Sequence, residues 1–378
     1  MARKYGKKNV VKVDPLAYNI GLFGSGGIGK TSLAIEMCEK LVGENGYIHC
    51  NMLYEKGADA IQGAVSEDVK TWSKLDEIID DIVENKDTDY KELRVLIYDT
   101  LDELENLGKK EVIRLHNLEN PKNKTKNYNS CFGGYSRQNE KLSDIILDSI
   151  EKLRNVGVSV LIIGHVKRKT LTDPVTSLEY DVITAKCSNR IFDDIKTKLD
   201  VLGLGIIKRE VGVDVMGKNA FTGKDITIND VKSEKRVISF RDDNYTVESK
   251  SRFADIINEV PFDADEFIKA IKDAIEKAYN KKDIGKTMEQ AKKEQEKELK
   301  EMVKSNLEEV KKEKEIKNKF GTKEEILESI KTFYQNTENA DAKAKIKESI
   351  HALGLGKFDE LLECDYEAII NIYNITQE

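Results

Sequence analysis

The chain has 378 residues, of which 39% are hydrophobic and 35% are charged. This length allows two or three domains, and the composition indicates a globular core with a strongly solvated remainder. The net charge of −7 gives no overall attraction to nucleic acid or anionic lipid, so any DNA contact has to come from local basic patches. The most apolar run, 158–166, is far too short to cross a bilayer.

The five cysteines are scattered along the chain, and none forms a C-x-x-C pair. This pattern indicates neither a disulfide framework nor a zinc site, and it fits a reducing cytosol. The basic N-terminus is not followed by an apolar segment with a cleavage site. We therefore expect a cytoplasmic protein.

Residues 1–17 form a basic N-terminal arm with no acidic residue before Asp14. Such an arm is either a solvated terminal segment or a segment that contacts phosphate groups. The basic residues of the arm are Arg3, Lys4, Lys7, Lys8 and Lys12.

Residues 18–39 read as a short apolar strand, a glycine-rich turn and an amphipathic helix. Within them, Gly24, Gly29, Lys30 and Thr31 satisfy G-x-x-x-x-G-K-[ST], the phosphate-binding loop pattern. The glycines let backbone N–H groups line a ring, and the helix adds its positive end, which favours an anion by about 0.3–1 kcal/mol. Lys30 can reach the β- and γ-phosphates, and the Thr31 hydroxyl can reach Mg²⁺. The alternative is a flexible glycine turn. The predicted nucleotide-binding residues are Gly24, Ser25, Gly26, Gly27, Ile28, Gly29, Lys30, Thr31 and Ser32.

Two further strands follow, each closed by an acid. The first spans 47–54 and ends at Glu55; residues 58–86 then read as helical, with a break near Trp72. The second spans 93–100 and delivers Asp99, which is the Walker B pattern of a buried strand that carries a carboxylate to the phosphate loop. Asp99 would then hold Mg²⁺ together with Thr31; the alternative is a structural Asp.

Beyond Asp99, apolar segments continue to alternate with amphipathic ones. This alternation indicates an α/β fold with a parallel, doubly wound sheet and an antiparallel extension. In such a sheet the phosphate site lies at the carboxyl ends of the strands, where we expect Gly29, Glu55, Asp99 and His165 to meet. The sequence predicts strands over 158–164 and 200–207, helices over 100–118, 137–155 and 189–198, a hairpin over 174–186 and antiparallel strands over 211–247.

The composition changes after residue 280. Residues 281–320 are mostly Lys, Glu and Gln, with apolar residues at a spacing of three to four and several Glu–Lys pairs four residues apart. This pattern favours a long solvated helix or a short coiled coil that acts as a linker, and Gly321 ends it. Residues 321–378 then read as a small all-α module.

These residues resemble the cores of RecA-type ATPases. The likeness is strongest to the compact phage RecA-like proteins, which are linked to single-strand annealing or recombination. It covers about residues 18–270 and implies a RecA-like ATPase core over 18–280 that uses ATP and Mg²⁺. The motifs that carry it are the loop at 24–31, Glu55, Asp99 with Thr100, and the stretches 161–169 and 238–253.

The resemblance implies a role for four residues of the core. Lys30 and Glu55 would be catalytic, with Glu55 polarising the attacking water, unless Glu55 is only a solvated acid at a strand end. His165 matches a polar sensor of the γ-phosphate, although a histidine there could equally be a satisfied core residue. Arg241 lies where such filaments place a basic residue into the ATP site of the neighbouring subunit.

The resemblance also implies two DNA-binding loops, which would bind backbone phosphates and stack bases on Tyr128, Phe132 or Tyr135. A solvated charged face is the alternative for each loop. The basic residues of the first loop are Lys122, Lys124, Lys126 and Arg137, and those of the second are Lys167, Arg168, Lys169 and Lys186.

The sequence therefore predicts a Mg²⁺-dependent ATPase that binds single-stranded DNA as a homo-oligomer and acts in phage-type recombination, annealing or replication. It would work in the bacterial host cytosol if a phage encodes it. RecA itself has an N-terminal helical domain that this chain lacks, so strand exchange is not implied. Residues 281–378 could bind a single-strand-binding protein. The main alternative is a nucleotide-switched adaptor or loader that acts through this tail; a small-molecule kinase is less favoured because no Arg-rich lid is evident.

Overall fold

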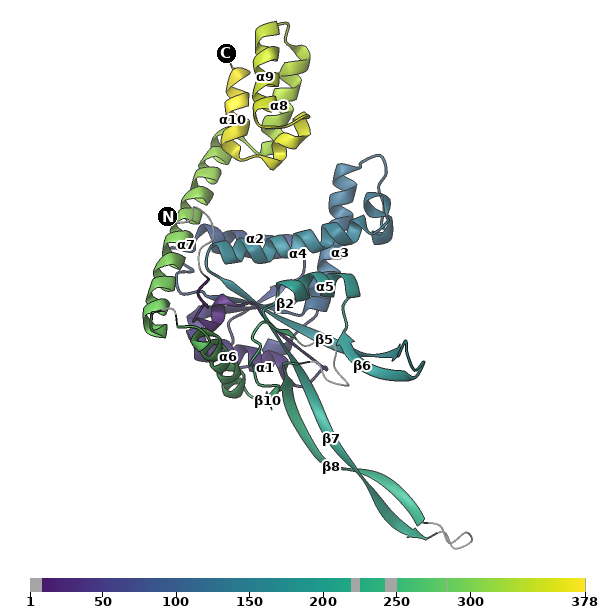
Figure 1. Ribbon diagram of the computed structural model, residues 1–378. Helices are drawn as coiled ribbons and strands as arrows, with labels where there is room; N and C mark the ends of the chain where they lie inside the picture. Colours follow the sequence, from purple (N-terminus) through teal and green to yellow (C-terminus); the bar gives the residue numbers. More distant parts are fainter. Residues whose placement is uncertain (1–8, 219–224, 242–249, 284, 378) are drawn as a thin grey trace. The chain divides into compact units, whose positions relative to one another are not determined.

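The structure is a computed structural model that describes residues 9–218, 225–241, 250–283 and 285–377 (Figure 1). A ten-stranded mixed sheet forms its centre, in the order β10-β8-β7-β1-β5-β4-β2-β3, with β6 paired to β5 and β9 to β7. The strands are β1 Ile20–Gly24, β2 Tyr47–Met52, β3 Ser66–Val69, β4 Val95–Asp99, β5 Ser159–Thr172, β6 Glu179–Ala185, β7 Val201–Lys218, β8 Asp225–Ser239, β9 Lys250–Ser251 and β10 Glu259–Pro261.

Six neighbouring strands, from β7 through β1, β5, β4 and β2 to β3, run parallel. β8 and β10 extend the sheet antiparallel on the β7 side. The α/β class with a mostly parallel sheet and an antiparallel extension is therefore confirmed. The prediction of a helix throughout 58–86 is wrong in part, because β3 lies within it. The exposed Ser-Glu-Asp-Val sequence of β3 lacks the alternation that identifies a strand, and only pairing with β2 defines it.

Helices cover both faces of the sheet (Figure 1). α1 and α6 pack on one face, where their apolar side chains share a core with β1, β4 and β7. α2, α3, α4 and α5 pack together on the other face. Two-sided coverage explains why the central strands are almost continuously apolar. The helices of the first part of the chain are α1 Lys30–Val42, α2 Trp72–Glu84, α3 Leu101–Glu119, α4 Arg137–Asn155, α5 Asn189–Lys198 and α6 Ala264–Asn280.

Two pairs of strands continue past the sheet as ribbons. β5 outruns β1 and pairs with β6 through the stretch 166–172, and β7 pairs with β8 over most of its length. Both ribbons leave from the same edge, because β1 ends at Gly24 opposite His165 of β5 and Gly205 of β7. This is the edge that carries the glycine-rich loop.

The described part of the N-terminal arm is held by the long helix α7, Met288–Phe320. The side-chain amide of Gln295 donates to the carbonyl of Val11, and its amide oxygen accepts from the N–H of Val13. Lys12 between them is exposed. Four basic residues of the predicted arm lie outside the described residues: Arg3, Lys4, Lys7 and Lys8.

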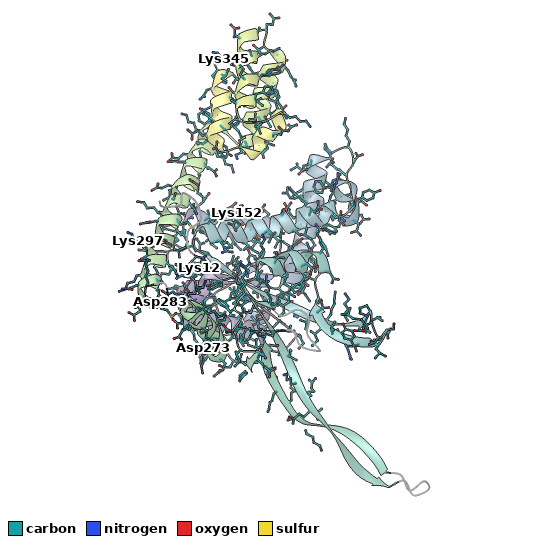
Figure 2. The ribbon with its side chains drawn as sticks, viewed as in Figure 1. Lys12, Lys152, Asp273, Asp283, Lys297 and Lys345 are labelled. Carbon is teal, nitrogen blue, oxygen red and sulfur yellow. The ribbon has the colours of Figure 1, made fainter. Side chains whose placement is uncertain are left out.

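The chain divides into two compact units, 1–303 and 304–378, so the division falls within α7. The charged side chains of this helix, such as Lys297, project outward (Figure 2). The domain boundaries at 280 and 320 stay predictions. The second unit has its own apolar core, formed by residues such as Ile330, Ile346 and Ile369. Its remaining helices are α8 Lys323–Asn336, α9 Ala340–Ala352 and α10 Tyr366–Ile375.

Among the described helices, none combines the length and apolar character that a membrane crossing requires.

Candidate nucleotide-binding site

The glycine-rich loop joins β1 to α1 and has the backbone of an anion cradle. Gly27 and Gly29 have φ values of +74° and +105°, which favour glycine. A Cβ on Gly26 or Gly27 would meet no atom within 4 Å, so the space above the loop is open. Because α1 begins at Lys30, its free N–H groups and positive helix end face this space.

Lys30 is buried against the loop that it would serve. Its ammonium group donates to the carbonyl oxygens of Gly24 at 3.1 Å and Ser25 at 3.0 Å. Burial lowers the pKa of Lys30, and the negative charges of Asp99, Asp102 and Glu55 oppose that shift. The ammonium therefore lies at the mouth of the loop, within the field of three carboxylates.

The Walker B carboxylate meets the loop helix directly. The Thr31 hydroxyl donates to Oδ2 of Asp99 at 2.6 Å, and Asp99 is buried at the end of β4, where its peptide bond to Thr100 is cis. Gly57 packs so closely on Thr31 that a Cβ there would lie 2.5 Å from Oγ1. Three segments distant in sequence thus fix one hydroxyl and one carboxylate side by side.

β5 lies between β1 and β4 and places His165 between the loop and Asp99. In the sheet register His165 is opposite Gly24, and Ile163 is opposite Asp99. The backbone N–H and Nδ1 of His165 contact the Asp102 carboxylate at 3.2 and 3.1 Å, and the Lys186 ammonium lies 3.2 Å from it. His165 is therefore bound to a partner that the sequence did not suggest.

Glu55 completes the edge. Its Oε1 lies 4.0 Å from Nδ1 of His165. Burial raises the pKa of Glu55, and the charge of Asp99 raises it further, while His165 opposes the shift. A carboxylate with a raised pKa beside a triphosphate site is suited to accept a proton from water. The structure thus brings together the loop, Glu55, Asp99 and His165 at the carboxyl ends of the strands.

The basic residues of the second predicted DNA-binding loop lie on the ribbon that continues from His165. Lys167, Arg168 and Lys169 are exposed on β5, although Arg168 forms an ion pair with Asp181 of β6. Lys186 differs from these three, because its ammonium turns toward Asp102 and the phosphate site. Its predicted contact with DNA competes with this ion pair.

The first predicted DNA-binding loop is remote from the site. It follows α3, whose 19 residues start beside Asp99 and extend for about 28 Å at 1.5 Å per residue. The expected stacking by two aromatic residues is disfavoured, because Tyr128 bonds to Gln138 through its hydroxyl and Phe132 packs edge-on against His116. Tyr135 is 99% exposed. The loop's basic residues are all exposed, namely Lys122, Lys124, Lys126 and Arg137.

Arg241 lies toward the opposite edge of the sheet from the loop. It follows the end of β8, beyond Ser239, and its guanidinium donates to the carbonyl of Ala254. Its predicted role in a neighbouring subunit stays a prediction. Because β8 runs antiparallel to β1, Arg236 instead lies beside the loop and donates to the carbonyl of Ile28 at 3.4 Å.

Sequence reasoning missed four residues at this site: His49, Gly57, Asp102 and Arg236. Asp102 had a detectable signal, because it follows Asp99 by three residues in the first turn of α3. The other three become neighbours of the loop only through strand pairing, which leaves no local trace in the sequence.

The residues of this edge fit a nucleotide with a divalent cation. The open cradle above Gly26 and Gly27 suits phosphate oxygens, and Thr31 and Asp99 supply the hydroxyl and carboxylate oxygens that Mg²⁺ prefers. Buried polar atoms around Asp99, including Nδ1 of His49 and Oγ1 of Thr100, have no hydrogen-bond partner among the described residues. Such atoms can bond to the waters of a hydrated cation.

No curated protein matches the chain. The family model for the AAA domain matches residues 16–253, which contain the loop, Asp99 and the whole parallel sheet. The chain therefore belongs to the AAA domain family of P-loop ATPases.

Proposed function

We propose that the chain is a Mg²⁺-dependent ATPase that binds single-stranded DNA and acts in recombination, annealing or replication of the phage RecA-like type. The observation that carries the proposal is the continuity of β5. One strand holds His165 between the loop and Asp99 and then runs on as a ribbon with Lys167, Arg168 and Lys169. A strand shared in this way can transmit a change at the phosphate site to a basic surface.

The chemistry follows from the positions of the side chains. Lys30 and the N–H groups of the loop would hold the phosphates, and Thr31 with Asp99 would hold the cation, which when bound neutralises charge on the transferring group. Glu55 would accept a proton from the attacking water, and His165, 4.0 Å from it, would report the state of the γ-phosphate. Stabilisation of the transition state would be mainly electrostatic.

The test is the rate of phosphate release at low salt, with and without single-stranded DNA. We expect DNA to raise the rate and Lys30→Ala to abolish it. Lys40→Ala is the matched control, because Lys40 is on the same helix and pairs with Asp265 and Glu36 rather than with the loop. Turnover that does not respond to DNA would overturn DNA coupling, and release of phosphate without an added acceptor would exclude a kinase.

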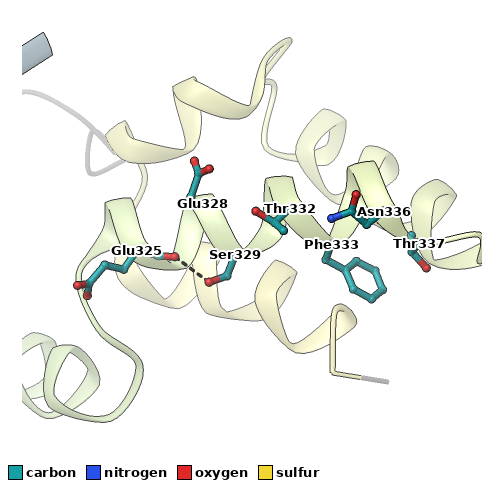
Figure 3. Close-up of a pocket in the computed structure, with 7 residues that line it drawn as sticks. All are labelled: Glu325, Glu328, Ser329, Thr332, Phe333, Asn336 and Thr337. Carbon is teal, nitrogen blue, oxygen red and sulfur yellow. Dashed lines mark hydrogen bonds between the residues drawn. The ribbon is translucent and has the colours of Figure 1, made fainter. Parts of the chain in front are cut away.

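A second candidate is a nucleotide-switched adaptor, and the compact second unit favours it. That unit carries a hollow of about 840 Å³ along α8, with Phe333 half-buried among polar residues (Figure 3). A pull-down with residues 304–378 as bait, including a single-strand-binding protein among the prey, would test it. In this case nucleotide would change affinity for the partner, and Glu55→Gln would leave that change intact.

A further inference from the structure

His49 is fully buried on β2, next to the strand that ends at Asp99. Its side chain is 0% exposed, and Nε2 lies 3.0 Å from Oδ2 of Asp99, which is itself 2% exposed. Because β2 pairs in parallel with β4, His49 lies two residues before Asn51, the register partner of Asp99. The pair is thus a product of strand register, and it lies beneath the phosphate site rather than in it.

The direction of this hydrogen bond follows from the acceptor. An ionised carboxylate only accepts, so Nε2 of His49 carries the proton and donates it. Thr31 donates to the same oxygen, Oδ2. Two donors on one carboxylate oxygen fix the plane of the group, and neither uses Oδ1. The second ring nitrogen of His49 has no partner among the described residues, so no other side chain described there accounts for the ring's orientation.

We propose that His49 is a positioning residue for the divalent cation, which acts by holding the Asp99 carboxylate in the orientation that ligates the metal. The proposal rests on the proposed ATPase function. Groups that orient a metal ligand through a hydrogen bond change metal affinity by roughly 10- to 100-fold when they are removed. The chemistry that His49 supplies is one N–H donor at a fixed place.

The test compares two amides that place their N–H₂ differently. The amide of Gln reaches the position of Nε2 and keeps the donor to Asp99, whereas that of Asn reaches only the position of Nδ1. The full-length protein with His49→Gln, His49→Asn or His49→Leu is titrated with Mn²⁺ in the presence of ADP, and bound Mn²⁺ is measured by electron paramagnetic resonance. ADP affinity without metal and circular dichroism are measured on the same samples.

We expect H49Q to bind Mn²⁺ as the wild type does, and H49N and H49L to bind it about 10- to 100-fold more weakly with unchanged ADP affinity. His116→Asn is the control, because His116 is also buried and hydrogen-bonded but lies toward the far end of α3. It should leave Mn²⁺ affinity unchanged.

Equal Mn²⁺ affinity in folded H49N and the wild type would overturn the positioning role while leaving the ATPase proposal intact. Unfolding of both H49N and H49L would also overturn it, in favour of a purely structural histidine. A wild type that binds no Mn²⁺ with ADP would instead refute the ATPase proposal, and the role of His49 with it.

Discussion

The Lys186 ammonium lies 3.2 Å from a carboxylate oxygen of Asp102, and the same carboxylate accepts hydrogen bonds from the backbone and the ring of His165. Lys186 directly follows β6, while His165 belongs to β5. One buried carboxylate therefore ties both strands of the basic ribbon to the first turn of α3. The base of the ribbon is fixed at the edge of the sheet where the loop lies.

Asp102→Asn should lower stability at pH 7 by about 1.5–3 kcal/mol, because it removes the charged partner of Lys186 and His165. Burial raises the pKa of Asp102, but its hydrogen bonds to His165, its attraction to that ring and its bond to Lys186 outweigh burial and hold the pKa well below the usual range. A carboxyl with a lowered pKa stabilises the native state above its unfolded pKa, about 3.9, and this stabilisation is lost as pH falls toward the folded value.

Urea unfolding at pH 7 and pH 3 measures this difference. The gap between Asp102→Asn and the wild type should shrink at pH 3. Asp59→Asn, at an exposed position, should stay within about 0.5 kcal/mol of the wild type at both pH values. A gap of the same size at both pH values would show that the charge of Asp102 does not stabilise the fold.

Glu55→Gln should reduce turnover by about 10²- to 10⁴-fold, because it removes the base. Burial, then the charge of Asp99, raise the pKa of Glu55 above the ordinary value of 4.5. Since the ionised carboxylate is the active form, turnover should fall as pH drops through this raised pKa. The acidic limb of the pH–rate profile should therefore lie above 4.5.

The same substitution should stabilise the protein at pH 7. A carboxyl whose pKa is raised on folding destabilises the native state at every pH above its unfolded pKa, where the native form has to hold the charge. Calorimetry should show a higher Tm for Glu55→Gln than for the wild type, while Glu44→Gln, at an exposed position, should leave Tm unchanged. A lower Tm would show that Glu55 is structural.

Replacement of Lys167, Arg168 and Lys169 by Ala should weaken binding to single-stranded DNA and reduce its salt dependence. Each phosphate contact contributes about 0.7 to the slope of log K against log salt, so three lost contacts lower the slope by about 2. Fluorescence anisotropy at several salt concentrations measures it. The matched variant replaces the remote loop's basic residues Lys122, Lys124 and Lys126, and an equal loss there would place the DNA on both loops.

Gly57→Ala should weaken binding of Mg²⁺ with nucleotide without touching either group. Its Cβ would lie 2.5 Å from Oγ1 of Thr31, so the hydroxyl has to move away from Asp99. Isothermal titration with MgADP should show the loss while the melting temperature changes little. Gly356→Ala, whose Cβ would have a nearest contact at 3.9 Å, should behave as the wild type. Undiminished MgADP affinity in Gly57→Ala would count against the role of Thr31.

The local sequence was sufficient to predict the loop and most of the elements. The glycines, Lys30 and Thr31 lie within eight residues, so their geometry is set by one strand, one turn and one helix. α4 and α5 have the bounds that amphipathic spacing predicts, 137–155 and 189–198. The acid at the end of β4 was likewise evident, because an apolar run closed by Asp is a local pattern.

Only the tertiary structure decided what surrounds Asp99. β5 lies between β1 and β4, and β2 lies on the other side of β4, so His165 and His49 approach the site from different strands. Arg236, rather than Arg241, lies at the loop because β8 runs antiparallel. Strand order and register arise from contacts between segments tens to hundreds of residues apart. A single sequence carries that information in its packing as a whole, and no local pattern reports it.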